Sequence, residues 1–411
     1  MLRQQNWRTR DIWSISLSAF FADLGYQSVL AAFPLFLVVY LHRPVWEYGL
    51  AMALSYGGGA IFSLVGARVG DRIGHRRLAI IGNLLIPLLS LSALSANPAL
   101  AIGLLTGGWW ARNLRSPSRR VMLNEAVSAE EYRVRVFGFL HALDVGGAAA
   151  AAILVIIAIR NGVPFRLLFV FTIIPLLISS IALSRATTGK TPKAAERKSG
   201  RSHATAKKRH PNGAKAIFMS TALYGFTFYS IGFPVLTIAQ KTGSKTSGIL
   251  AFLIFQGFSA ATGYLLAKRL GLTLFRRFLN LGLLGYLVSA LGALVLILDI
   301  HYQLGTAEYF VGMAILGFAL GIIETLEPSL IAVLSEGGSA GRGFGALSAS
   351  RSLGLFAGNL IMGLLYQLGP SWSYAYAGIM AAVASAIMIF AAGSFDRPRE
   401  LLNAHTGESS R

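Results

Sequence analysis

A small set of ionisable side chains lies inside apolar stretches that are long enough to cross a bilayer. A charged group at the centre of a membrane helix costs about 2.5–3.5 kcal/mol on insertion scales, so such groups usually face the protein interior and have partners. Groups of this kind often mark the path of an ion or a substrate. The residues in question are Asp23, Arg112, Arg115, His141, Asp144, Glu324, Glu327 and Arg351.

The spacing of these residues places opposite charges at similar depths. At about 1.5 Å per helical residue, Asp23, Asp144 and Arg115 lie about 18, 15 and 16 Å from one end of their segments. In the second half of the chain, Glu327 and Arg351 also share one level. The pattern predicts either static pairing within each half or a latch in which Asp144 and Arg351 take part across the halves.

Long apolar runs predict the membrane helices that hold these charged residues in place. Hydrophobic residues make up 54% of the 411-residue chain and charged residues 13%, far below the roughly 25% of soluble domains. Runs of spanning length predict an all-α membrane protein with helices at 12–40, 46–65, 78–94, 98–126, 134–159, 165–184, 216–240, 248–266, 275–298, 306–334, 344–367 and 372–393.

The twelve runs fall into two groups of six. A polar, basic stretch over residues 185–215 separates a first bundle at 1–184 from a second at 216–395, and 396–411 forms a tail. An offset of 207 residues lays Phe137–Gly147 over Phe344–Gly354, so that Asp144 falls on Arg351 and the sign of the charge reverses. Such parallel repeats predict two bundles related by pseudo-twofold symmetry about an axis along the membrane normal.

Basic residues give the orientation. Most Lys and Arg residues fall on one side of the predicted membrane, the side of the linker and both termini, which the positive-inside rule makes cytoplasmic. The net charge of +20 therefore reflects topology and contact with anionic lipid rather than nucleic-acid binding. The segments of the other side hold Arg43, Arg160, Arg166, Lys241 and Lys245. The sequence thus predicts an integral protein of a bacterial or archaeal cytoplasmic membrane.

One polar turn between the second and third runs, Gly66–Leu78, reads GARVGDRIGHRRL. It is similar to the signature G-x-L-A-D-R-x-G-R-K between helices 2 and 3 of the major facilitator superfamily. The residues that match are Asp71, Arg72, Gly74 and Arg76, whereas Ala67, Val69 and His75 depart from it. The resemblance implies that the matching residues form a cytoplasmic gate that clasps the opposite bundle.

The resemblance extends into helices 1, 4, 5 and 10. The run from Trp109 resembles a bacterial subgroup of unassigned substrate with R-x-x-G-K-G-I-R-T-x-P-R-D in helix 4 and G-x-H-R-A-x-D-x-x-G in helix 5, matching at Arg112, Arg115, Pro117, Arg119, Phe137, Gly138, His141, Ala142, Asp144 and Gly147. Helix 1 matches at Asp23 and Pro34, and helix 10 at Glu324. Arg120 replaces an acid, and a Gly-Pro typical of drug–proton antiporters is missing from helix 5.

The resemblance implies proton coupling through Arg112, with Asp23 and Asp144 as acids that carry the proton. Burial and a neighbouring arginine act on a carboxyl in opposite directions. Pairing for membrane insertion alone is the alternative for both acids. His141 suits a proton relay or a packing role, and a metal site is disfavoured because no further ligands converge on it.

The sequence therefore predicts a secondary active transporter that moves a small solute by alternating access and is coupled to protons. The direction is open, because an exporter and an importer share the same architecture. A uniporter or an uptake symporter is the alternative within transport. A lipid-modifying enzyme and a scaffold or receptor are the alternatives outside it, and the sequence shows no motif for catalysis or for a cofactor. The partners expected are a small-molecule substrate, protons and the lipid bilayer, with the chain acting as a monomer.

Overall fold

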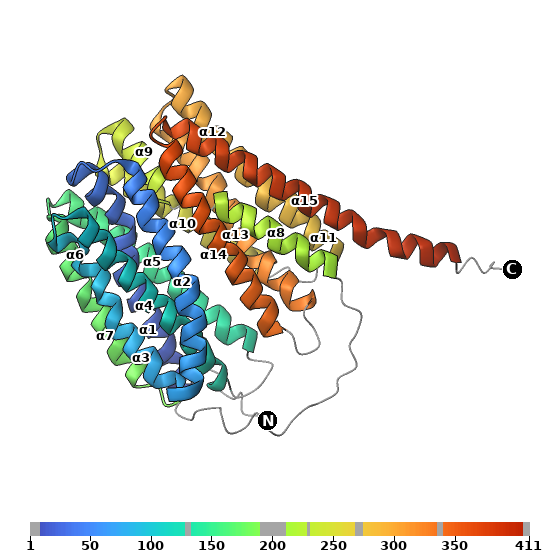
Figure 1. Ribbon diagram of the computed structural model, residues 1–411, viewed down its shortest axis with the longest axis horizontal. Helices are drawn as coiled ribbons and strands as arrows, with labels where there is room; N and C mark the ends of the chain where they lie inside the picture. The colour runs from blue at the N-terminus through green and yellow to red at the C-terminus, as the bar shows by residue number, and fades with distance from the viewer. Residues whose placement is uncertain are drawn as a thin grey trace, which may run out of the picture. The chain divides into compact units, whose positions relative to one another are not determined.

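The computed structural model describes residues 9–127, 133–189, 211–227, 231–267, 274–334 and 340–405. Within these residues every regular element is a helix (Figure 1). Much of the predicted linker, at 190–210, lies outside the described residues, as does the end of the tail.

The helices of the first half follow the predicted runs. Three of the six runs form single helices, and the other three contain a break or a change of helix type. They are α1 (Arg10–Pro34) with η1 (Leu35–Tyr40), α2 (Val45–Ile73), α3 (His75–Leu85) with η2 (Ile86–Leu94), α4 (Pro98–Glu125), α5 (Arg133–Arg160), α6 (Phe165–Phe171) and α7 (Ile173–Ser184).

The helices of the second half also match the predicted runs, and α13 has the predicted bounds. They are α8 (Pro211–Thr227), α9 (Gly232–Thr242), α10 (Lys245–Ala267), α11 (Leu274–Asn280), η5 (Leu281–Leu287), α12 (Val288–Tyr302), α13 (Thr306–Leu334), α14 (Ala340–Leu365) and α15 (Pro370–His405). Helix α15, drawn in red in Figure 1, continues into the predicted tail.

Local sequence signals set the helix ends. The side chain of Asn97 accepts hydrogen bonds from the Ala99 and Leu100 amides at 2.9 and 3.4 Å, and Pro98 occupies the first turn of α4. Gly74 has a φ of 94°, a conformation that favours glycine, and it separates α2 from α3. The prediction that the second helix ends near Val65 is wrong, because α2 carries the polar residues Arg68, Asp71 and Arg72 in its last turns before Gly74.

Nine helical segments of the described residues are long and apolar enough to cross a membrane. Three predicted runs are not among these nine: α4 carries several arginines, α14 carries Arg351 and Asn359, and the run at 216–240 includes residues outside the described ones. The fold class is nevertheless the predicted one, an all-α membrane protein.

The chain divides into two compact units. The first comprises Met1–Ser202 and Tyr229–Gln256, and the second comprises His203–Phe228 and Gly257–Arg411. In the first unit α1 packs against α5, α7 and α9, and α2 packs against α4. In the second, α8 packs against α14 and α15, and α12 against α13 and α15. The predicted bundle boundaries, 1–184 and 216–395, stay a prediction.

Candidate functional site

The first unit holds a buried acid on α1. The side chain of Asp23 is buried, with 4% of the residue exposed. Among the described residues its Oδ1 atom has no hydrogen-bond partner. Asp23 lies within electrostatic reach of Arg112, Arg115, Arg119 and Asp144. The charges that the sequence placed at one depth therefore do lie together in the structure.

Three arginines on α4 form one row beside this acid. Arg112, Arg115 and Arg119 follow i, i+3, i+7 spacing, which places them on one helix face. The Arg112 guanidinium lies 5.4 Å from the centroid of the Tyr26 ring and 4.9 Å from that of Trp109, within cation–π range. Its Nη2 atom is 3.5 Å from the Tyr26 hydroxyl.

The other two arginines of the row have partners on different helices. The Nη1 atom of Arg115, a fully buried residue, donates to Oδ1 of Asn83 on α3 at 2.5 Å. The Nη2 atom of Arg119 lies 3.3 Å from both carboxylate oxygens of Asp144 on α5. Further N–H groups of Arg115 and Arg119 are buried without a hydrogen-bond partner among the described residues. Asp144 is thus paired within its own half.

Asn83 connects the arginine row to a cluster of serines. Its Nδ2 atom donates to Oγ of Ser179 at 3.0 Å and of Ser180 at 2.9 Å, both on α7. Ser179 in turn donates to the Ser18 carbonyl oxygen on α1 at 2.6 Å. These bonds satisfy the amide that orients Arg115. The sequence interpretation missed this network, although an asparagine in the apolar run at 78–94 was a signal for it.

Two glycines allow the helices that carry the charges to approach closely. A Cβ atom on Gly147 would lie 2.4 Å from the Phe20 carbonyl oxygen and 3.0 Å from Cβ of Asp23. One on Gly82 would lie 2.9 Å from Cβ of Arg115. Small residues at such crossings let membrane helices pack backbone to backbone. The spacing of the acids on α1 and α5 therefore depends on Gly147.

The second unit holds an arginine fork. Arg351 on α14 donates from Nη1 to Glu324 at 2.8 Å and from Nη2 to Glu327 at 2.5 Å. Glu327 is fully buried, whereas 41% of the Glu324 side chain is exposed. The Tyr286 hydroxyl also donates to Oε1 of Glu327 at 2.5 Å. The two acids of α13 thus share one arginine.

Two tyrosines surround the buried end of this fork. The rings of Tyr224 and Tyr286 lie 5.3 Å apart between centroids. Tyr224 has a hydrogen bond with Ser289. Neither tyrosine is among the site residues predicted from the sequence. Nothing in the sequence distinguishes Tyr286 from the other tyrosines of apolar runs.

His141 lies apart from these clusters. Its side chain is exposed on α5, one helical turn before Asp144. Within the described residues no group of three or more His, Cys, Asp or Glu side chains is placed to hold a metal ion. The relay role of His141 stays a prediction.

The predicted gate residues have local partners at the junction of α2 and α3. Asp71 lies 3.3 Å from Nε2 of His75, whose Nδ1 atom is 3.2 Å from the Ser118 hydroxyl on α4. Arg76 donates from Nε to the Ala186 carbonyl oxygen at 2.7 Å and from Nη2 to that of Ser184. Arg76 therefore binds the carbonyl groups at the end of α7, while Arg72 is exposed. His75, a departure from the signature, is the link that the sequence interpretation did not expect.

Apolar helices of spanning length, with charged clusters buried inside each unit, define a helical membrane protein. Residues 15–299 match the sequence profile of the Major Facilitator Superfamily. The chain belongs to this superfamily, and it is a secondary transporter embedded in a membrane. A search of curated protein sequences found no match.

Solved structures of transporters share the fold. A POT family transporter in complex with a thioalcohol-conjugated peptide has a TM-score of 0.74 at 15% identity, with 93% of this chain and 96% of that chain covered. A POT family transporter in complex with 5-aminolevulinic acid has the same TM-score and identity, covering 94% and 96%. A D-xylose–proton symporter has a TM-score of 0.73 at 16% identity, covering 92% and 97%.

Proposed function

We propose that this transporter couples the movement of a small solute to protons, and that Asp23 is the group that binds the proton. The observation that carries the proposal is the environment of Asp23. It is a buried acid, one oxygen of which has no hydrogen-bond partner in the part of the chain that the structure describes, and it lies beside a row of arginines that have other partners. Proton relays through membranes use acids in such positions.

Two opposing effects make the charge of Asp23 sensitive to its neighbours. Burial disfavours the carboxylate, whereas a nearby guanidinium favours it. Arg119 is shared with Asp144, and Arg115 with Asn83. A movement of α1 or α5 by a fraction of a helical turn changes which guanidinium faces Asp23. Proton binding and helix movement are coupled in this way, as alternating access requires.

Asp71, Arg72, Gly74 and Arg76 complete the proposal as the cytoplasmic gate. Arg76 and His75 fix the junction of α2 and α3 to α7 and α4. The exposed Arg72 and the half-exposed carboxylate of Asp71 stay available for a second contact during the transport cycle. In the structure Asp144 pairs with Arg119 and Arg351 pairs with Glu327, each within its own half. A latch in which Asp144 and Arg351 take part across the halves therefore stays a second prediction.

The similarity to a proton symporter supports coupled transport over uniport. The two POT family structures hold a peptide conjugate and an amino acid derivative. We therefore propose small polar solutes, including sugars, amino acids and short peptides, as the first candidates. The direction of transport, which the sequence leaves open between export and import, is decided by the same experiment.

The test begins with a thermal-stability screen of the purified protein against such solutes, since a ligand of the folded state raises the melting temperature. Each hit is then added to proteoliposomes that contain a pH-sensitive dye. We expect the wild type to move protons with the solute, and Asp23→Asn to keep solute exchange while losing proton movement. Asp11→Asn is the control, because Asp11 lies on the same helix but binds Thr187 at its end. Proton movement by Asp23→Asn at the wild-type rate would overturn the assignment.

A further inference from the structure

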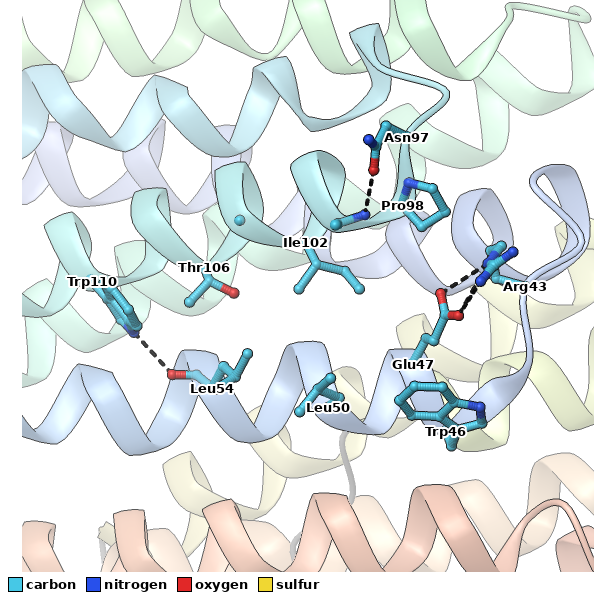
Figure 2. Close-up of a pocket in the computed structure, with 12 residues that line it drawn as sticks. Arg43, Trp46, Glu47, Leu50, Leu54, Asn97, Pro98, Ile102, Thr106 and Trp110 are labelled. Atoms are coloured by element: carbon cyan, nitrogen blue, oxygen red, sulfur yellow. Dashed lines mark hydrogen bonds and ion pairs between the residues drawn. The ribbon is translucent and has the colours of Figure 1, made fainter.

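A groove between α2 and α4 lies away from the buried charges. It has a volume of about 650 Å³, and α2 and α4 supply most of its lining (Figure 2). Its middle is apolar, with Leu50, Leu54 and Ile102 on its walls, and its mouth is polar, with Arg43, Glu47 and Asn97. The groove thus suits an amphiphilic ligand, with the apolar middle for a hydrocarbon chain and the polar mouth for a head group.

The inner end of the groove is closed by Trp110. Its indole N–H donates to the Leu54 carbonyl oxygen at 2.9 Å, and its ring stacks on Phe62 at 5.0 Å between centroids. The indole fits there only because residue 58 is a glycine, since a Cβ atom on Gly58 would lie 2.2 Å from the indole Nε1 atom. At the inner end of the groove, Trp110 therefore links α4 to α2 through this hydrogen bond, which Figure 2 shows at the end opposite Arg43.

The length of the groove corresponds to one leaflet of a bilayer. From Trp46 to Leu54 on α2 it measures about 12 Å, and from Pro98 to Trp110 on α4 about 18 Å, at 1.5 Å per residue. Half of a hydrocarbon core of about 30 Å is about 15 Å. Both helices begin at the mouth, so the polar residues lie at the membrane surface and the apolar ones in the hydrocarbon.

The mouth presents a cation to the membrane surface. Arg43 binds the Glu47 carboxylate through Nε and Nη2, which leaves its Nη1 group without a hydrogen-bond partner among the described residues. The Arg43 side chain is 43% exposed and that of Glu47 only 8%, so the accessible charge is positive. Trp46 beside it is partly exposed, as is usual for tryptophan at the membrane interface. Guanidinium groups bind phosphate oxygens through paired N–H groups.

We propose that this groove binds one phospholipid, with a single acyl chain between α2 and α4 and the phosphate on Arg43. The chain length that fits, the closed inner end and the exposed guanidinium at the surface support this occupant. A second groove, of about 790 Å³, lies over α1 between α5 and the helices α6 and α7, and its lining is almost wholly apolar. That groove offers acyl chains a place without a charged anchor, and it serves as an internal reference.

Gly103 gives a way to fill the groove without disturbing the fold. It lines the groove, and a Cβ atom built on it meets nothing within 4 Å. Gly103→Leu therefore places a branched side chain in the path of the acyl chain, whereas Gly103→Ala leaves most of the space open. Arg43→Gln removes the phosphate contact. Arg160→Gln is its matched control, because Arg160 is an exposed arginine at the non-linker end of α5, outside the lining of the groove.

The experiment uses the full-length protein in nanodiscs doped with a phospholipid that carries a diazirine in the middle of one acyl chain. After illumination, mass spectrometry maps the cross-linked peptides, and yields are expressed relative to those of the reference groove. We expect cross-links on the Leu50–Leu54 and Ile102–Thr106 peptides in the wild type and in Gly103→Ala. Gly103→Leu should lose them, and Arg43→Gln should reduce them at least threefold while Arg160→Gln does not.

Two outcomes would overturn the proposal. One is an undiminished yield in Gly103→Leu when its melting temperature equals that of the wild type. The other is an equal effect of Arg43→Gln and Arg160→Gln, which would identify bulk lipid rather than a bound one. Adding inorganic phosphate distinguishes a lipid phosphate from a free one. If the lipid is held by its acyl chain as well as by Arg43, the cross-link yield should not change. A yield that falls when free phosphate is added would refute the role of the acyl chain.

Discussion

The fork of Arg351 allows a quantitative test of how the charges in the second unit are stabilised. Glu327 and Glu324 both accept a hydrogen bond from Arg351, but Glu327 is fully buried and Glu324 is not. Removing one member of a buried ion pair costs about 3–5 kcal/mol, because the remaining charge has no compensation. An exposed pair contributes about 0–1 kcal/mol. We therefore expect Glu327 to dominate the interaction.

Arg351→Leu should lower the free energy of unfolding by about 3 kcal/mol, at the lower end of that range, because the Tyr286 hydroxyl still donates to Glu327. In the double variant with Glu327→Gln the loss of the arginine no longer leaves a buried charge. The double-mutant cycle should therefore give a coupling energy of about 2 kcal/mol. The same cycle with Glu324→Gln should give less than about 1 kcal/mol.

The assay is unfolding in mixed micelles with increasing amounts of sodium dodecyl sulfate, followed by tryptophan fluorescence. Retention on size-exclusion chromatography checks that each variant is folded at the start. Equal coupling energies for Glu324 and Glu327 would contradict the argument from burial. A stable Arg351→Leu variant would show that the fork does not hold Glu327.

Three further predictions concern packing and capping. Gly354→Val should cost about 1–3 kcal/mol of overpacking, because a Cβ atom there would lie 2.1 Å from the Ala222 carbonyl oxygen. Gly345→Ala on the same helix meets nothing within 4 Å and should not lower the melting temperature, since alanine also favours the helix over glycine. Asn83→Leu removes the hydrogen bond to the buried Arg115 and should cost about 2 kcal/mol in the same unfolding assay; an unchanged stability would contradict the role of this network. Arg76→Ala should raise hydrogen exchange at residues 185–189 and leave exchange in α5 as in the wild type, with a uniform increase counting against a local cap.

The helices could be predicted because hydrophobic runs of spanning length have few alternatives in a membrane. The internal repeat also indicated equivalent positions in the two halves. It aligns Gly147 with Gly354, and each of these glycines lies where two helix backbones approach closely. The repeat also aligned Asp144 with Arg351, and each of these residues belongs to an ion pair in its own half.

The partners within each cluster were harder to predict. Depth along a helix gives the level of a side chain and leaves its direction open, so Arg115 rather than Arg119 was matched to Asp144. The structure pairs Asp144 with Arg119 and gives Arg115 the Asn83 amide instead. Tyr286 belongs to the fork because η5 and α13 pack together, a contact that no local pattern in the sequence encodes.

The assignment of residues 229–256 to the same compact unit as the first 202 has a consequence for how the polypeptide can be divided. Tyr48 stacks edge-on against Phe233 at 5.4 Å, and Gly232 has no room for a side chain beside the Tyr48 ring. A protease cut or a gene split between residues 190 and 210 would therefore separate the N-terminal fragment from residues 229–256 of its own compact unit, which would stay on the C-terminal fragment. Co-expressed fragments should associate and reassemble, whereas the N-terminal fragment made alone should be degraded.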